Sequence, residues 1–358
     1  MKIIITGACA VSARSVVRSL KISKKFCDAT FIGWDMATTL YGLYEGLFDR
    51  VYKVPAVSEP HYKEVVEQIL EKEKPDAVIV VPEVEVLYWA NNHFDIPCLL
   101  PPVDFCKLAI SKEKVFRTLS PYGLVPRNRQ VHRNDILDDK FASPLGYPVW
   151  IRDASAGTAS GKGSFKADNL AELQAWVQIN TGIDQFQLSQ FLPGGNYGVF
   201  MIFDSGRLRK LAIAERIEYI MSKVAVSGIT GNTSKGRLLN DEQIKKTALQ
   251  AIEILCKETN TVMNGLVVCD MKADENGVPF VTEINIRHVA FSSSFANAGF
   301  NISEFQLLLA LNRGDEISPE IEMTFPPNNL ILRDVDGLPI YLKDYRPILE
   351  GEFIEKNE

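Results

Sequence analysis

Two carboxylates in the last third of the chain have the type and spacing of a divalent-metal site. Asp270 and Glu283 lie in two runs rich in β-forming residues, separated by Asn276-Gly277. Asn-Gly is a strong signal for a two-residue hairpin turn, and this turn would place Asp270 directly opposite Glu283. Opposed carboxylates repel each other unless a cation lies between them. The sequence therefore predicts an all-oxygen site for Mg²⁺ or Mn²⁺.

The strand that carries Glu283 continues as E-x-N-x-R, which adds two polar side chains to the same face. Side chains alternate along a strand, so Asn285 and Arg287 should share the face of Glu283. Asn285 would complete the metal site and Arg287 would bind an anion. The alternation assigns Val268, Lys272 and Val281 to this face, and Cys269, Met271, Phe280, Thr282, Ile284 and Ile286 to the other. The alternative for such a pattern is a hairpin with a solvated acidic face.

A second region suited to chemistry is a loop of small residues at 155–164, which follows a strand predicted over 149–153. Small residues let backbone N–H groups approach phosphate oxygens, and Lys162 and Arg152 would add positive charge. The loop is not a Walker A motif, because Gly157 and Gly161 enclose three residues instead of four. The alternative is a loop without a ligand and an ordinary surface arginine.

Bulk composition excludes several classes of function. The 358 residues suggest two or three structural units, and 46% apolar with 23% charged residues is ordinary for a soluble protein. A net charge of −6 gives no support to a nucleic-acid partner. No apolar run is long enough for a membrane span or a signal peptide. Six scattered cysteines without C-x-x-C and four isolated histidines predict a cytoplasmic protein without a zinc site.

The first 105 residues alternate between strands and helices, which predicts a parallel α/β unit. Strands are expected at 2–6, 30–34, 49–54 and 76–81, and helices at 12–20 and 62–73. The segment after the first strand has one glycine where the dinucleotide motif G-x-G-x-x-G needs three, so a Rossmann-type oxidoreductase is disfavoured.

The remaining elements must position these groups. We expect helices at 111–122, 170–179, 241–258 and 303–311, strands at 187–192, 197–203 and 208–214, a loop at 225–235, and a hairpin around Asp336-Gly337. Lys112 and Lys114 lie in the first turn of the first of these helices, where the helix dipole disfavours cations. A functional use of one of these lysines would explain that placement.

Four stretches occur in an order that resembles the ATP-grasp superfamily, in particular its carboxylate–amine ligases and carbamoyl-phosphate-synthase-like proteins. SKEKVFRTLSPYGLVP is similar to the family's D-K-x₆-L-x₃-G-I-x-x-P helix, and PLGYPVWIRDASAGTASGKGSF to its strand and glycine-rich loop. QFLPGGNYGVFMIFDSG is similar to the E-F-x-x-G-x-E-Y-S-V-D segment. DMKADENGVPFVTEINIRH matches the D-x₁₂-E-x-N-x-R metal segment most closely.

The resemblance implies a fold and its division. Residues 1–105 would form a parallel-sheet, Rossmann-like pre-ATP-grasp domain. A two-lobed α+β ATP-grasp domain would follow, with a small lobe carrying the glycine-rich loop at 106–185 and a large lobe carrying the metal site at 186–328. Residues 329–358 would form a C-terminal hairpin and tail.

The resemblance also implies roles for individual residues. ATP phosphates would be bound by Lys112, Arg152 and the loop residues Gly157, Ser160, Gly161, Lys162 and Gly163. The nucleoside would contact Gln190, Phe191, Leu192 and Asn196. The metal ligands would be Asp270, Glu283 and Asn285, and the catalytic residues Arg287, Asn285 and Arg152, with Arg287 steadying an acyl phosphate. Candidate substrate contacts, chosen for their position near the motifs, are Arg216, Asn232, Thr233 and His288.

The implied activity is an ATP- and Mg²⁺-dependent ligase that joins a small-molecule carboxylate to an amine. The sequence leaves the oligomeric state open, and a homodimer is the common assembly among soluble enzymes. The chain departs from the family pattern with Arg152 in place of Lys, Ser111 in place of Asp, and Gln190 and Asn196 in place of Glu. Arginine keeps phosphate binding, whereas the two amides put ATP specificity in question. The alternatives are an ATP-grasp kinase and a non-catalytic nucleotide-binding subunit.

Overall fold

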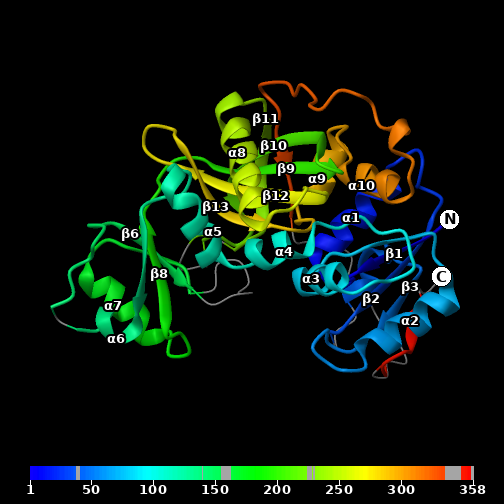
Figure 1. Ribbon diagram of the computed structural model, residues 1–358, viewed down its shortest axis with the longest axis horizontal. Coiled ribbons are helices and arrows are strands. Elements are labelled where there is room, and N and C mark those ends of the chain that lie inside the picture. The colour runs from blue at the N-terminus through cyan, green and yellow to red at the C-terminus, as the bar shows by residue number, and fades with distance from the viewer. Residues whose placement is uncertain are drawn as a thin grey trace.

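The computed structural model describes residues 1–37, 41–138, 140–154, 163–223, 228, 230–334 and 348–355 of the chain. Its strands form three sheets, which Figure 1 shows with a parallel sheet at the lower right, a small sheet at the left and a larger one at the top. The α/β class predicted from the sequence is confirmed. No helix among these residues is both long and apolar enough to cross a bilayer.

The first sheet has a parallel core in the strand order β3-β2-β1-β4. Consecutive residues of β1 pack on opposite faces, since Ile4 belongs to the cluster on the side of α2, and Ile3 and Ile5 to the cluster on the side of α1. A parallel sheet buried on both faces was expected here. Its elements are β1 (Lys2–Thr6), α1 (Val11–Lys21), β2 (Thr30–Asp35), η1 (Tyr41–Gly46), β3 (Arg50–Lys53), α2 (Tyr62–Glu73), β4 (Ala77–Ile79), α3 (Glu83–Asn91) and α4 (Val103–Ala109).

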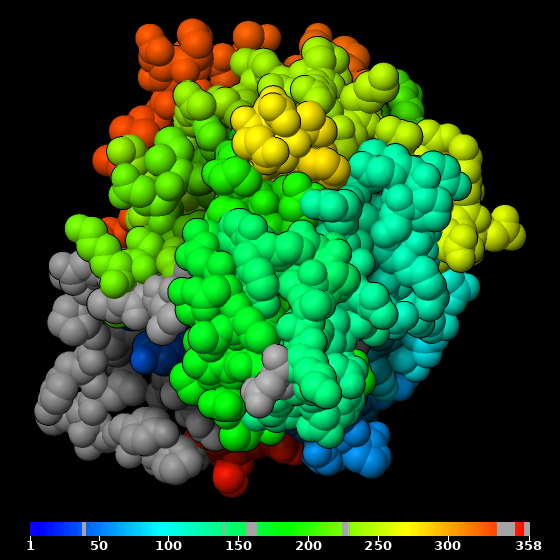
Figure 2. Space-filling view, turned by 90° about the vertical axis from the view of Figure 1, so that its left-hand side faces the viewer, coloured from blue at the N-terminus to red at the C-terminus, as the bar shows by residue number. Residues whose placement is uncertain are grey.

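The second sheet is antiparallel, in the order β5-β8-β6-β7, and Figure 2 shows this part of the molecule, coloured teal to green, facing the viewer. Leu173 and Val177 of α7 pack with Ile151, Phe186 and Leu188 of the sheet to form its own core. The elements are α5 (Lys112–Leu119), η2 (Ser120–Tyr122), β5 (Asn128–His132), α6 (Arg133–Ile136), β6 (Val149–Asp153), β7 (Phe165–Ala167), α7 (Leu170–Ile179) and β8 (Gln185–Gln190).

The third sheet has six strands in the order β13-β12-β9-β10-β11-β14. Helix α8 covers one face, and α9 and α10 cover the other. The elements are β9 (Asn196–Asp204), β10 (Arg207–Tyr219), β11 (Thr233–Leu239), α8 (Glu242–Thr259), β12 (Gly265–Ala273), β13 (Pro279–Asn285), α9 (Ser292–Asn297), α10 (Ile302–Ala310), η3 (Gly314–Glu316) and β14 (Ile331–Leu332). The loop predicted over 225–235 therefore ends too late, because β11 begins at Thr233.

The described parts of the C-terminal segment add strands to two of the sheets. β14 pairs with β11 of the third sheet, and β15 (Phe353–Glu355) pairs antiparallel with β3 of the first. Asp336-Gly337, the predicted hairpin turn, lies outside the described residues. The division of the chain at residues 105, 185 and 328 stays a prediction.

The hairpin of β12 and β13 brings Asp270 opposite Glu283, as predicted, although by a different route. The loop has three residues, Glu275 to Gly277, with Gly277 at φ 82°. This loop alone would shift the pairing by one residue. A β-bulge between Asp270 and Met271 leaves Thr282 as the extra residue and restores the expected register.

The bulge also corrects the predicted faces of β13. Val281 is fully buried in the core beside Cys269 and Met271, instead of sharing the face of Asp270. Thr282 lines the cavity beside the face that carries Asp270. Strict alternation had assigned Thr282 to the opposite face. A bulge places two consecutive residues on one side of a strand, so strict alternation fails at this point.

Candidate active site

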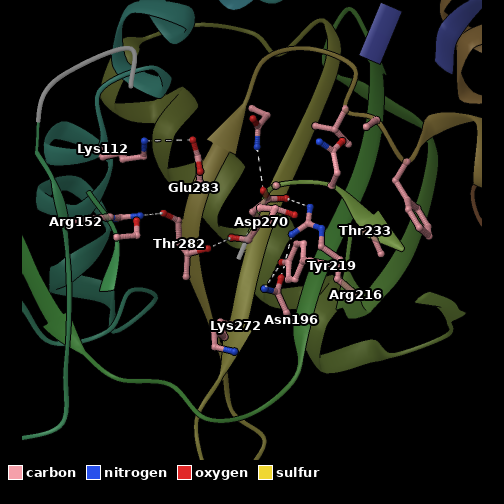
Figure 3. A pocket seen from close by; sticks show the side chains of 18 of the residues that line it. Lys112, Arg152, Asn196, Arg216, Tyr219, Thr233, Asp270, Lys272, Thr282 and Glu283 are labelled. Atoms are coloured by element: carbon pink, nitrogen blue, oxygen red, sulfur yellow. Dashed lines mark hydrogen bonds and ion pairs between the residues drawn. The ribbon is translucent and has the colours of Figure 1, made fainter. Parts of the chain in front are cut away.

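A cavity of about 560 Å³ opens between the four-stranded sheet, the six-stranded sheet and the N-terminal end of α1. Figure 3 shows its central part. Thirteen of the residues predicted from the sequence line it: Lys112, Arg152, Gln190, Phe191, Leu192, Asn196, Arg216, Asn232, Thr233, Asp270, Glu283, Asn285 and Arg287. Residues separated by up to 175 positions in the sequence are therefore brought to one site.

Asp270 is held from two sides. Arg216 Nη2 lies 2.5 Å from its Oδ1, and Asn285 Nδ2 donates to its Oδ2 at 3.2 Å. Burial raises the pKa of Asp270 and Glu283 raises it further, while Arg216 lowers it. The pair of opposed carboxylates therefore carries the mutual repulsion that the hairpin pattern predicted.

Glu283 faces a cation from another part of the chain. Its Oε1 lies 3.5 Å from Nζ of Lys112, in the first turn of α5. The Lys112 side chain is 14% exposed, whereas Lys114 on the same turn is exposed to solvent. Of the two lysines singled out in the sequence, Lys112 is the one that lines the cavity.

Arg152 enters the cavity from β6 with part of its guanidinium unpaired. Nη1 donates to the carbonyl of Thr282 at 3.1 Å, and the guanidinium lies 4.8 Å from the centre of the Phe116 ring. Nε and Nη2 are buried and have no hydrogen-bond partner among the described residues. Burial lowers the pKa of Arg152. Buried donors without partners are costly in a folded protein, so this group is suited to an anionic ligand.

Asn196 lies within the same cluster as Asp270. Its Oδ1 accepts from Nη1 of Arg216 at 3.0 Å, and its Nδ2 donates to the hydroxyl of Tyr219 at 2.7 Å. Figure 3 shows these side chains converging from β9 and β10. In this arrangement the amide orients Arg216, which in turn pairs with Asp270.

Several predicted residues are not brought to the cavity. His288 is fully buried behind it, with Nδ1 at 3.1 Å from Ser292 Oγ and Nε2 at 2.6 Å from Gln306 Oε1. Because both ring nitrogens already have partners in the core, the predicted substrate contact by His288 is not supported. Gly163 does not line the cavity, and its carbonyl accepts from Nε1 of Trp176 at 2.9 Å. Gly157, Ser160, Gly161 and Lys162 lie outside the described residues.

The polar residues at the site that the sequence did not identify include Tyr219, Lys272 and Glu83. Tyr219 and Lys272 line the cavity, and burial raises the pKa of Tyr219 and lowers that of Lys272. Glu83 of α3 lies 3.7 Å from Nε of Arg287. The alternation of β12 already placed Lys272 on the metal face, which was a usable signal. The local sequence did not indicate Tyr219 or Glu83, because Tyr219 bonds to Asn196 of another strand and Glu83 pairs with Arg287 of a distant segment.

The charges of the cavity fit a phosphate-bearing ligand with a divalent cation. Its described lining holds six lysine or arginine and three acidic side chains, in a chain whose net charge is −6. No group of three His, Cys, Asp or Glu side chains within the described ranges could hold a metal unaided. Two carboxylates with an amide oxygen match a Mg²⁺ ion that takes its other ligands from phosphates and water. The donor set therefore fits the predicted ion.

Solved structures share this architecture over nearly the whole chain. N5-carboxyaminoimidazole synthetase from Staphylococcus aureus, complexed with ADP, matches with a TM-score of 0.64 and 14% identity, over 92% of this chain and 79% of that one. L-amino acid ligase from Bacillus licheniformis matches with a TM-score of 0.59 and 18% identity, over 89% and 77%. The chain has the ATP-grasp fold. At these identities the likeness extends to the fold alone.

Two further comparisons concern the sequence of the chain. Over 148 residues it is 25% identical to the carbamoyl phosphate synthase large chain of Pyrococcus furiosus, a match that covers 39% of this chain and 13% of that protein. The chain thus spans a small part of its curated relative. No protein-family model matches the sequence.

Proposed function

We propose that the protein is an ATP- and Mg²⁺-dependent ligase that activates a small-molecule carboxylate and joins it to an amine. The observation that carries this proposal is the positively charged cavity in which Asp270 and Glu283 face each other on an ATP-grasp scaffold. Phosphoryl transfer depends mainly on positioning and on neutralising phosphate charge, and this cavity offers both.

The proposed reaction has two steps. An oxygen of the substrate carboxylate attacks the γ-phosphorus of ATP, the bond to the β,γ-bridging oxygen breaks, and ADP leaves. The amine nitrogen then attacks the acyl phosphate, inorganic phosphate leaves, and the nitrogen loses a proton. Neither step requires a nucleophile from the protein.

The proposed roles follow the placement of the side chains. Lys112 and Arg152 bind phosphate oxygens, and the unpaired Nε and Nη2 of Arg152 are suited to this. Asp270, Glu283 and Asn285 hold Mg²⁺, which neutralises phosphate charge when bound. Arg287 steadies the activated carboxylate.

The nucleoside is proposed to lie beside Gln190, Phe191 and Leu192, which line the cavity. Asn196 was predicted to lie near the ribose, and its two bonds to Arg216 and Tyr219 favour a role in orienting Arg216. The loop residues Gly157, Ser160, Gly161 and Lys162, together with Gly163, remain proposed phosphate contacts. Asn232 and Thr233 remain proposed substrate contacts.

Glu283→Gln tests the proposal, with Glu275→Gln in the exposed loop of the same hairpin as its matched control. We expect Mg²⁺-dependent ADP release, measured across a panel of carboxylates and amines, to fall about 100-fold in Glu283→Gln. The control should keep the wild-type rate. Undiminished ADP release by Glu283→Gln would refute the metal assignment.

Hydroxylamine distinguishes a ligase from a kinase. A ligase should yield an acyl hydroxamate with the carboxylate that stimulates ADP release, because hydroxylamine intercepts the acyl phosphate. A stable phosphorylated product without hydroxamate would identify a kinase. ATP binding without turnover on any member of the panel would identify a non-catalytic subunit.

A further inference from the structure

Arg333 is a fixed cation in the lining of the cavity. Its backbone N donates to the carbonyl of Ser234 at 2.7 Å, and its Nη1 donates to the carbonyl of Thr233 at 3.0 Å. No carboxylate within the described ranges forms an ion pair with it. Burial, and then the nearby Arg18, lower its pKa to about 10. A desolvated guanidinium without an acid partner is costly unless a ligand supplies the negative charge.

Helix α1 presents its N-terminal end to the same cavity. Ala10, Val11 and Ser12 line it. Ala10 at the N-cap offers no side-chain acceptor, and the first turn holds no acidic residue. The first amide groups of an α-helix have no partner within the helix and carry partial positive charge. This end therefore adds hydrogen-bond donors to the lining that Arg333 shares.

The helix is anchored, so these amides have a fixed position. The backbone N of Ser293 donates to Ser15 Oγ at 2.8 Å, and Asn301 Nδ2 donates to the carbonyl of Ser19 at 2.6 Å. Both bonds tie α1 to the segment around α9 and α10. Donors held in place before a ligand arrives cost little to order when it binds.

The acidic side chains of the described lining belong to other elements. Asp153 lies on β6, and Asp270 and Glu283 lie on the metal hairpin, where Arg216 and Lys112 face them. Val289 and Phe291 contribute apolar surface to the lining. Arg287 also lines the cavity and is paired at 3.7 Å with Glu83. Outside the cavity lining, Asp35 accepts from the backbone N of Cys9 at 2.9 Å and Glu45 pairs with Arg18 of α1. Within the described lining, no carboxylate forms an ion pair with Arg333.

We infer that Arg333 and the N-terminal end of α1 bind a second acidic group of the substrate. The inference rests on the proposed ligase function and names its substrate class. The substrate would be a small dianion, in which one carboxylate is activated beside Arg287. The other group, a carboxylate or a phosphate, would lie between the guanidinium and the helix amides.

Calorimetric titration of the protein saturated with a non-hydrolysable ATP analogue and Mg²⁺ tests this inference. Glutarate is compared with valerate, and phosphoglycolate with glycolate. At least one dianion should bind about tenfold more tightly than its monoanion, as expected for a charge-assisted hydrogen bond. The pair that shows the preference identifies the group as carboxylate or phosphate. Equal affinity within both pairs, or no binding of any of the four, would overturn the inference.

Arg333→Gln should abolish the preference and Arg333→Lys should keep part of it. If Arg333→Gln does not fold, Ser12 provides a second route, because Ser12→Asp places a negative charge in the first turn of α1. That substitution should stabilise the helix through its dipole and yet eliminate dianion binding, whereas Ser12→Asn, of the same shape, should lose far less of it. A merely structural site would not separate stability from binding in this way.

The inference and the proposed function fail separately. If Glu283→Gln loses Mg²⁺-dependent ADP release but Arg333→Gln binds both acid classes as the wild type does, the ligase stands and the substrate class is wrong. The same titrations on the nucleotide-free protein measure binding of the second acidic group without any turnover. A dianion preference there that is lost in Arg333→Gln would support the subsite even if ADP release proved independent of Glu283.

Discussion

The guanidinium of Arg216 lies 2.5 Å from Oδ1 of Asp270 and holds this carboxylate in the wall of the cavity. Their side chains are 13% and 19% exposed, so each would be a largely buried single charge without the other. We expect Arg216→Met to lower the free energy of unfolding of the ligand-free protein by about 3 kcal/mol, since the unpaired carboxylate remains buried. Urea titration measures this loss.

A second substitution separates the ion pair from simple packing. Asp270→Asn in the Arg216→Met background removes the stranded charge, so the double variant should recover most of the lost stability. Additive effects of the two substitutions would show that the pair does not couple. Mg²⁺ should stabilise the wild type against unfolding and leave the double variant unaffected, because it has lost a proposed metal ligand.

Lys112 and Lys114 offer a matched pair on one helical turn. Lys112→Gln removes a cation that lines the cavity, and Lys114→Gln removes one that faces solvent. We expect Lys112→Gln to weaken ATP binding about tenfold, measured as the dissociation constant, and Lys114→Gln to change it by less than about twofold. Equal effects would assign the loss to the charge of the helix as a whole.

The buried imidazole of His288 should make the protein less stable in acid. Burial lowers its pKa from 6.5 to about 4, so the unfolded chain takes up a proton between these values that the folded protein refuses. The free energy of unfolding should therefore fall as pH falls from 6.5 to 4, by an amount on the order of 3 kcal/mol. His288→Gln should show a flatter dependence in urea titrations across this range, and parallel curves would contradict the prediction.

The buried carboxyl of Glu85 should make the free energy of unfolding depend on pH in the opposite direction. Burial raises its pKa from 4.5 to about 7, and its Oε1 accepts from Tyr62 at 3.0 Å and from Trp34 Nε1 at 3.3 Å. The folded protein holds a proton that the unfolded chain releases, so this group costs stability as pH rises from 4.5 to about 7. Glu85→Gln should raise the free energy of unfolding at pH 8 by about 3 kcal/mol. The gain should shrink at pH 5, and a gain independent of pH would point to packing instead.

Strongly periodic segments were predictable from the sequence. The bounds of β1, α2 and α7 coincide with the predicted ones, because each carries a clear apolar pattern between charged or turn-forming flanks. Helix α9, with the sequence SSSFAN, and strand β5, with the sequence NRQVH, were not predicted. Neither has the propensity or the pattern of its class, so tertiary contacts determine both.

Some features of the site were likewise predictable from the sequence and others were not. The opposition of Asp270 and Glu283 was predicted from a two-residue turn, whereas the structure reaches it through a three-residue loop and a bulge that the sequence did not indicate. The presence of both in one cavity with Lys112 and Arg152 followed from the family motifs. Pairs between distant segments did not follow from either source. Arg152 reaches a carbonyl 130 positions away, and Arg216 reaches Asp270 across 54, because three-dimensional packing brings these segments together.

The bulge at Thr282 links the two sheets that flank the cavity. Its carbonyl, released from the regular ladder, accepts the bond from Arg152 and so fastens the four-stranded sheet to the six-stranded one. A phosphate that draws the same guanidinium toward itself competes with this fastening. We expect the four-stranded sheet to shift against the six-stranded sheet as a nucleotide enters, because the bond between Arg152 and the extra residue of the bulge can then break.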